Sequence, residues 1–357
     1  MSETPEYIKG RGSQLNVKNR FEKQGYSMEN IEEYHAPLET DNLTEYITVF
    51  PKTIINKVDS PDLGFMHSMN PYQGCEHGCI YCYARNSHEY WGYGPGLDFE
   101  RKILVKENAP ELLRKAFDNP RWKPETIMLS GNTDCYQPIE RKMKITQKIL
   151  KVCLEYRNPV GMITKNSLIL RDKELIAEMA SLHLASVAVS ITSLNEDTRQ
   201  RMEPRTTTSK QRLKIVEELA KLNVPVTIMV APVVPSINDH EIPEILKQCG
   251  ERGANSAGYT IVRLNGAISE IFTDWVHKNY PDRAEKVLDQ IAECHGGSLK
   301  DSRFGTRMRG EGNVAQTIKD LFKMSKQKYL KPKDFGKYEP ASFRRPPKNG
   351  QLQLFNF

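Results

Sequence analysis

The sequence predicts an α/β protein built around an open, partial barrel of six βα units. The central part of the chain alternates short apolar segments with longer amphipathic segments, which is the pattern of a parallel sheet with crossover helices. Six such units are too few to close the eight-strand ring of a complete barrel. A chain of 357 residues lies within the length that α/β barrels reach as one large domain.

Six strands are expected where short apolar runs occur, at residues 65–72, 126–131, 160–165, 186–192, 225–233 and 257–264. Five helices are expected between them where apolar residues recur at helical spacing, at residues 110–117, 139–156, 173–182, 209–221 and 239–250. In barrels of this kind the chemistry sits at the C-terminal ends of the strands. The residues that follow each strand are therefore the candidates for a functional site.

The chain divides into four expected regions. They are an N-terminal extension (1–60), the core barrel (61–300), a C-terminal helical segment (301–330) and a basic, proline-rich tail (331–357). Nine Lys or Arg and two acidic residues lie between Lys323 and Gly350, while the whole chain has a formal net charge of +6, so the rest is close to neutral. Such a tail either contacts phosphates or is an ordinary solvated linker.

Composition indicates a soluble, cytoplasmic protein. Apolar residues make up 38% of the chain and the mean hydropathy is −0.58. No apolar run approaches the roughly 20 residues that span a bilayer, and the N-terminus lacks the pattern of a secretory signal. The seven cysteines are clustered, which favours a reducing compartment over a disulfide framework. Cys153, Cys249 and Cys294 lie in helical patterns and are expected to be core thiols.

The most specific motif is the triplet Cys75, Cys79 and Cys82, which has the spacing C-x3-C-x2-C. Three thiolates can hold three irons of a [4Fe-4S] cube and leave the fourth iron open, whereas a structural zinc needs four protein ligands. The alternative is a zinc knuckle that takes His77 or His88 as its fourth ligand. Such zinc sites usually consist of two separated ligand pairs, so the spacing favours the open cluster.

With the aromatic residue Tyr81 directly before Cys82, this motif resembles the radical S-adenosylmethionine (SAM) superfamily. The flanking segments that extend the resemblance are 70–74 (NPYQG), 83–85 (YAR), 88–90 (HEY) and 96–100 (GLDFE). They resemble the branch that contains spore photoproduct lyase and its "DNA repair photolyase" relatives, and the similarity extends over most of residues 40–300. The resemblance implies a partial barrel of the radical SAM type, a [4Fe-4S] cluster and SAM, reduced by an external donor such as flavodoxin or ferredoxin. It also implies a 5′-deoxyadenosyl radical that abstracts hydrogen from a substrate.

The resemblance assigns SAM-binding roles near the cysteines and after the second strand. Tyr81 is expected to pack on the adenine; the alternative is a residue that only fills the core beneath the cluster. Ser130, Asn132 and Thr133 are expected to bind the methionine amine and the ribose of SAM. Their alternative role is a helix cap without chemistry.

Further roles fall at the third and fourth strands. Lys165 ends an apolar strand, where an ammonium group needs an anionic partner. The resemblance implies that this partner is the SAM carboxylate. Ser190 lies where relatives contact the ribose, and Arg205 is expected to orient the same ligand. Residues 88–91 either line the substrate mouth or begin a cap over it.

Cys135 is a candidate catalytic residue, because spore photoproduct lyase uses a barrel cysteine as its hydrogen donor. In the family this donor falls earlier in the loop, near Gly131 of this chain. The alternative for Cys135 is therefore a buried or merely adjacent thiol. The displacement argues against assigning repair of the spore photoproduct itself.

The C-terminal peptide resembles the short motif with which bacterial polymerases and repair proteins bind the DNA sliding clamp. Its residues Gln351, Leu352, Leu354 and Phe355 combine apolar anchors with a polar contact. The alternative is a terminal strand or apolar tuck that holds the tail against the barrel.

Together these features predict a lyase-like radical SAM enzyme that acts on DNA, in lesion repair or in nucleic-acid modification. One alternative is a radical SAM enzyme for a peptide, an RNA or a small molecule. The other is a non-enzymatic metal-binding adaptor in which the cysteine motif staples the fold.

Overall fold

The computed structural model describes residues 8–21 and 43–347. Its central strands are β2 (Ile55–Lys57), β3 (His67–Met69), β6 (Ile127–Leu129), β7 (Val160–Thr164), β8 (Ala185–Ser190), β9 (Val226–Val233) and β10 (Ser256–Ile261). They form one sheet in the order β10-β9-β8-β7-β6-β3-β2. The strands from β10 to β3 pair in parallel, and β2 adds to β3 in antiparallel orientation. This open parallel sheet confirms the predicted fold class.

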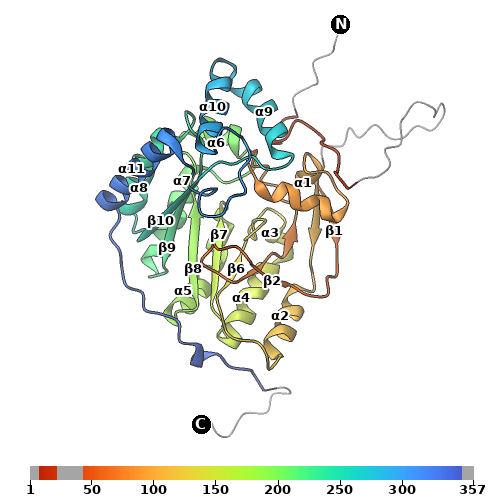
Figure 1. Ribbon diagram of the computed structural model, residues 1–357. Helices are drawn as coiled ribbons and strands as arrows, with labels where there is room; N and C mark the ends of the chain where they lie inside the picture. The colour runs from red at the N-terminus through yellow and green to blue at the C-terminus, as the bar shows by residue number, and fades with distance from the viewer. Residues whose placement is uncertain (1–7, 22–42, 348–357) are drawn as a thin grey trace, which may run out of the picture.

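Helices cover the outer face of the sheet (Figure 1). They include α2 (Ala109–Asp118), α3 (Glu140–Met143), α4 (Ile145–Tyr156), α5 (Lys173–Ser181), α7 (Ser209–Lys221) and α8 (Ile242–Glu251). The helix expected at 139–156 is divided, because Lys144 adopts a left-handed φ of 54° between α3 and α4. The other expected helices agree with the structure to within about three residues at each end.

Further elements lie outside the predicted set. They are η2 (Tyr83–Trp91), α1 (Asp98–Arg101), α6 (Glu196–Met202), α9 (Ile268–Asn279) and α10 (Ala284–Cys294). Of the helical segment expected at 301–330, residues Gly312–Tyr329 form α11, which packs against α8 and β10. A second sheet of three short strands, β1 (Glu45–Thr48), β5 (Lys102–Val105) and β4 (Tyr72–Gln73), lies beside the first strands of the barrel.

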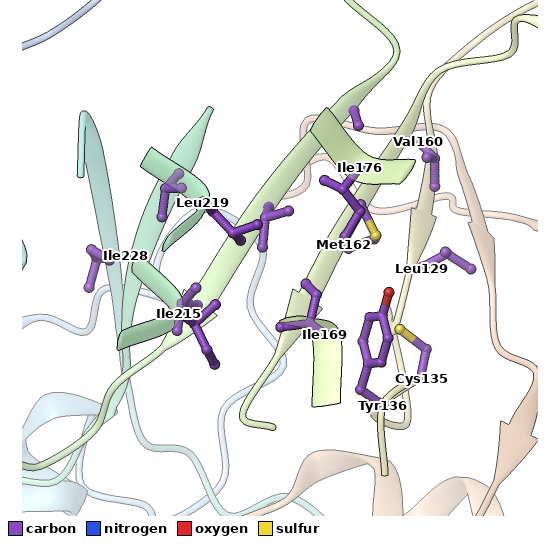
Figure 2. Close-up of a cluster of buried hydrophobic side chains, with 14 of the residues drawn as sticks. Leu129, Cys135, Tyr136, Val160, Met162, Ile169, Ile176, Ile215, Leu219 and Ile228 are labelled. Carbon is purple, nitrogen blue, oxygen red and sulfur yellow. The ribbon is translucent and has the colours of Figure 1, made fainter. Parts of the chain in front are cut away.

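The two faces of the large sheet differ in character. Along β8, Val187 and Val189 are buried beneath the helices, whereas Ser186 is exposed and Ala188 partly exposed on the concave face. On the same face Gly161 makes room for Met128, whose Cε would lie 2.9 Å from a Cβ at position 161. Large apolar side chains form the core between the sheet and the helices (Figure 2). The concave face of the half-barrel therefore carries small or partly exposed side chains, in contrast to the apolar core on the other face.

Residues 331–347 cross the lower end of the barrel as a strap (Figure 1). The ring of Phe343 packs on Phe117 and Tyr156, at centroid distances of 6.0 and 6.3 Å. Arg344 Nε donates to a carbonyl in the last turn of α4 at 2.9 Å, and Arg345 Nε donates to one at the end of α2 at 2.9 Å. These two cations therefore pair with backbone carbonyls at the C-terminal ends of two helices. Neither sequence-based interpretation of the basic tail included this role. None of the helices within the described ranges is long and apolar enough to cross a membrane.

Candidate functional site

Residues 74–82, the cysteine loop, carry the three cysteines between β4 and η2. Cys75 and Cys79 are 6% and 7% exposed, and Cys82 is partly buried. All three are free thiols. Gly74 and Gly78 have φ values of 80° and 66°, a region that glycine adopts without steric cost. The loop can therefore turn tightly around a metal cluster.

A buried ion pair supports this loop from behind. Arg85 Nη2 lies 2.5 Å from Glu100 Oε1, and both side chains are fully buried. Arg85 also donates to the carbonyl of Cys79 at 3.0 and 3.2 Å. The backbone N–H groups of Gly12 and Ser13 donate to Glu100 at 3.0 and 2.8 Å. The N-terminal segment and the cysteine loop are thus fixed by one carboxylate.

The three thiols suit the chemistry of an iron-sulfur cluster. Burial raises the pKa of Cys79 to about 12 and raises the pKa of Cys75 and Cys82 as well. Charges on Cys79 and Cys82 would raise the pKa of Cys75 further, so the three sulfurs are electrostatic neighbours. Neutral buried thiols at these positions become thiolates when they bind a cation, which the irons of a cluster supply.

The two histidines of the zinc alternative differ in their surroundings. His77 has Nδ1 at 3.4 Å from Asp134 and Nε2 at 3.3 Å from Asn166, so both ring nitrogens already have neighbours. His88 packs edge-on against Phe99, with ring centroids 5.6 Å apart. Within residues 8–21 and 43–347, no three His, Cys, Asp or Glu side chains converge closely enough to hold one metal ion. A [4Fe-4S] cube instead takes each cysteine on a different iron.

A second buried ion pair fixes the aromatic side chain of the motif. Tyr81 donates its hydroxyl to Glu203, which is paired with Arg212, and all three side chains are buried. Burial opposes the charge of Glu203, but Arg212 and Lys165 together with these hydrogen bonds lower its pKa to about 2. Lys165 Nζ lies 5.9 Å from the centre of the Tyr81 ring. The ring of Tyr81 is therefore held in place before any ligand binds.

The three residues expected after the second strand take part in hydrogen bonds that shape their loop. Ser130 Oγ accepts from the backbone N–H of Cys135 at 2.7 Å. Asn132 Nδ2 donates to Ser87 Oγ at 2.8 Å, and Thr133 Oγ1 donates to a carbonyl of β4 at 2.6 Å. These bonds join the loop after β6 to the segments on both sides of the cysteines. The predicted contacts of these residues with SAM stay predictions.

The remaining predicted site residues divide into two groups. Lys165 follows β7 near Tyr81; burial opposes its charge, but Cys79 and Glu203 raise its pKa. Ser190 is buried, and its carbonyl accepts from Arg212 at 3.0 Å, which ties it to the same network. Arg205 lies outside this network but against the cysteine loop, 3.7 Å from Glu76, and its backbone N–H donates to the carbonyl of His77 at 3.2 Å.

Cys135 is fully buried among apolar side chains. Its exposure is 0%, and it lies beside Leu129 and Tyr136 in the core (Figure 2). Burial raises the pKa of this thiol well above its usual value. The structure therefore favours the alternative of a buried thiol over that of a hydrogen donor at the mouth.

Sequence reasoning missed the charged residues that support the site. Arg85, Glu100 and Arg212 are fully buried although their residue types usually lie at the surface. Arg212 carries a signal that could have identified it, because it lies on the buried face of the amphipathic helix α7. Arg85 and Glu100 carry no such periodic signal.

Comparison with known proteins agrees with this geometry. Residues 69–249 match the family described as "Radical SAM superfamily". An uncharacterized protein of Mycobacterium tuberculosis is 32% identical over 244 residues, covering 68% of this chain and 72% of that protein. The "Radical SAM Nalpha-GlyT isomerase" of Pseudomonas phage M6 is 24% identical over 234 residues, covering 64% and 46%. Spore photoproduct lyase complexed with dinucleoside spore photoproduct has a similar fold, with a TM-score of 0.54, 15% identity and coverage of 80% and 79%.

Proposed function

The chain belongs to the radical SAM superfamily, and we propose that it acts on a nucleic acid, in the repair of a lesion or the modification of a base. The cofactors of this superfamily are a [4Fe-4S] cluster and SAM, and an external electron donor is required. The buried three-cysteine loop of the open half-barrel supports the radical chemistry, and the similar fold of a structure that contains a dinucleoside supports the nucleic-acid substrate.

The residues of this chain have distinct parts in the proposed reaction. Cys75, Cys79 and Cys82 would hold three irons and leave the fourth for SAM. When bound, the cluster and SAM supply the radical that abstracts hydrogen from the substrate. Lys165 provides a cation for the SAM carboxylate, and Tyr81, fixed by Glu203, provides a surface for the adenine.

The open shape of the half-barrel supports a large substrate. The inner side chains of β8, Ser186 and Ala188, are small, and the sheet does not close on itself, because β10 and β2 are its two outermost strands. A complete barrel closes its strands around a core of bulky side chains, whereas this sheet stays open. An enzyme that reacts with a nucleobase must take the base out of its stack and into a pocket, which needs such an opening.

The named relatives support nucleic acid as the substrate class. One solved structure of similar fold contains a dinucleoside spore photoproduct. This chain shares the cysteine triplet expected for that chemistry, but its Cys135 lies in the core. We therefore propose repair or modification of a base without assigning Cys135 as the hydrogen donor.

The proposed docking of the C-terminal peptide on a sliding clamp would place the enzyme on DNA. Gln351, Leu352, Leu354 and Phe355 lie outside the described residues, so this docking stays a prediction. The described chain ends at residue 347, at the end of the molecule away from α9 and α10 (Figure 1). Recovery of the clamp with the full chain, but not with a chain lacking residues 351–357, is the expected result, and equal recovery would reject it.

SAM cleavage tests the proposed function. The reconstituted enzyme is assayed anaerobically with a chemical reductant, in the presence of undamaged DNA, irradiated DNA, RNA or an unrelated peptide. We expect DNA to stimulate SAM cleavage and to yield an altered nucleoside on digestion. Stimulation by the peptide alone would assign a different substrate class, and a protein that never cleaves SAM would fit the adaptor hypothesis.

A further inference from the structure

Lys106 is a buried cation next to the mouth of the half-barrel. Lys106 is 8% exposed, and its Nζ donates to the carbonyl of Asn70 at 2.9 Å. In the described part of the chain this is its one hydrogen bond, and no carboxylate pairs with it. An ammonium group has three donors, and a buried charge without a counter-ion is unfavourable. Burial alone lowers the pKa of Lys106 to about 8. An anionic ligand would supply the missing partner.

The position of Lys106 connects it to the substrate side of the site. Asn70 follows β3, and its backbone carbonyl accepts the hydrogen bond from Lys106 Nζ. Its side-chain Oδ1 accepts the backbone N–H groups of Asn132 and Thr133 at 2.9 and 3.3 Å. Lys106 is therefore separated by one residue from the loop after β6. The cation expected for the SAM carboxylate, Lys165, follows a different strand, so Lys106 is available for another anion.

One exposed aromatic ring lies next to this cation, and a second follows from the neighbouring residue in the sequence. Trp91, at the end of η2, is 40% exposed, and its ring centre lies 5.9 Å from Lys106 Nζ. The adjacent Tyr90 is 72% exposed and lies 5.2 Å from the ring of Phe21. The guanidinium of Arg20 lies over both rings, but it is paired with Glu89. Rings that alternate with cations are the usual surface for single-stranded nucleic acid, on which bases stack beside neutralised phosphates.

We propose that Lys106 and Trp91 form a nucleotide subsite at the rim of the mouth, where Lys106 binds a backbone phosphate and Trp91 stacks on an adjacent unpaired base. This inference rests on the proposed function and adds the place where the strand is held. An acidic peptide could also place a carboxylate at Lys106, but it would give no role to the exposed indole. The nucleotide uses both features, so we assign the subsite to it.

Binding of a fluorescein-labelled oligothymidylate to the cluster-loaded protein tests the subsite. Fluorescence anisotropy is measured with SAM present at a series of salt concentrations. We expect Lys106→Met to weaken binding about tenfold and to reduce the slope of log K against log salt by about 0.7, the value for one single-strand phosphate contact. Trp91→Leu should also weaken binding about tenfold, with the slope unchanged, because stacking releases no counter-ion.

Matched variants separate these effects from general charge and folding effects. Lys115→Met removes one charge from the exposed surface of α2 and should bind like the wild type. Lys106→Arg should retain the salt slope, and Trp91→Phe should retain part of the affinity. Circular dichroism establishes that each variant is folded.

Three outcomes would overturn the subsite. If Lys106→Met binds with wild-type affinity and slope while the wild type binds well, the subsite is wrong and the nucleic-acid function stands. If the wild type binds no oligonucleotide, both are wrong. If an acidic peptide competes better than unlabelled oligothymidylate, the cation serves a different class of ligand.

Discussion

Glu203 and Arg212 form an ion pair in which both side chains are fully buried. The hydroxyl of Tyr81 donates to the same carboxylate, so the pair connects α7 to the motif that carries the cysteines. A buried pair of this kind gives the ring of Tyr81 one defined position, which a neutral core would not specify. The arrangement leads to a prediction about stability.

Removing one member of this pair leaves the other charge buried without a partner. Glu203→Gln or Arg212→Met is expected to lower the free energy of unfolding by about 3–5 kcal/mol. The double variant should recover much of this loss. Urea unfolding followed by circular dichroism measures the effect. Glu217→Gln, which removes an exposed partner of Lys221, is the control and should change stability little, because this pair is solvated. Equal effects of the two Glu→Gln changes would contradict the proposed role of burial.

The cysteine triplet predicts the iron content. The reconstituted wild type should contain about four irons per chain, and Cys79→Ala should lose most of them together with SAM cleavage. Cys249→Ala removes a thiol from the core on α8 and should retain the iron. Iron analysis and the visible absorbance of the cluster provide the readout. A Cys79→Ala protein with full iron and activity would reject the open-cluster site.

Cys135 is expected to have a structural role. Cys135→Ala should leave the rate and the products of turnover unchanged, because the thiol lies in the core. It should lower the free energy of unfolding by about 1 kcal/mol through the loss of packing. Product analysis by mass spectrometry decides the matter, since a new or trapped product in the variant would identify Cys135 as a hydrogen donor after all.

The lowered pKa of His88 should account for part of the pH dependence of stability. Burial lowers its pKa from 6.5 to about 4, although Asp98 opposes this shift. Between these values the unfolded state binds more protons than the native state, so stability falls as the pH falls from about 6.5 to about 4. His88→Phe should reduce this slope by at most about 1.4 kcal/mol per pH unit. Urea unfolding from neutral to mildly acidic pH measures it.

His277 is the control for this experiment. Its pKa is raised, chiefly by a hydrogen bond to the carbonyl of Thr273 and by Glu285, so its contribution to stability has the opposite sign. His277→Gln should therefore not reduce the fall in the free energy of unfolding at acidic pH. A His88→Phe protein with an unchanged slope would show that His88 is not the group that titrates.

The strap predicts different results for two truncations. Removal of residues 348–357 should leave the thermal midpoint unchanged, because it leaves every described contact of the strap in place. Removal of residues 331–357 should lower it, since Phe343 and the two arginines that satisfy the ends of α2 and α4 are lost. Thermal unfolding by circular dichroism compares them. Identical midpoints would show that the strap adds no stability.

The sequence by itself determined the parts of the protein that depend on local pattern. Alternating apolar and amphipathic segments predicted the parallel half-barrel, because each strand and helix buries one face of its own residues. The spacing of Cys75, Cys79 and Cys82 indicated an open-iron cluster, since three ligands within eight residues form one loop. The boundary errors arose where a single backbone angle decided the outcome, as at Lys144 between α3 and α4.

Tertiary structure alone decided which charges are buried and what they support. Glu100 and Arg85, Glu203 and Arg212, and Lys106 with the carbonyl of Asn70 come from different elements, and no local pattern relates them. It also placed Cys135 in the core, where the sequence had left open a hydrogen donor or a buried or adjacent thiol. The physical reason is that the energy of a charge or a thiol depends on its solvation and neighbours, which only packing between distant segments defines.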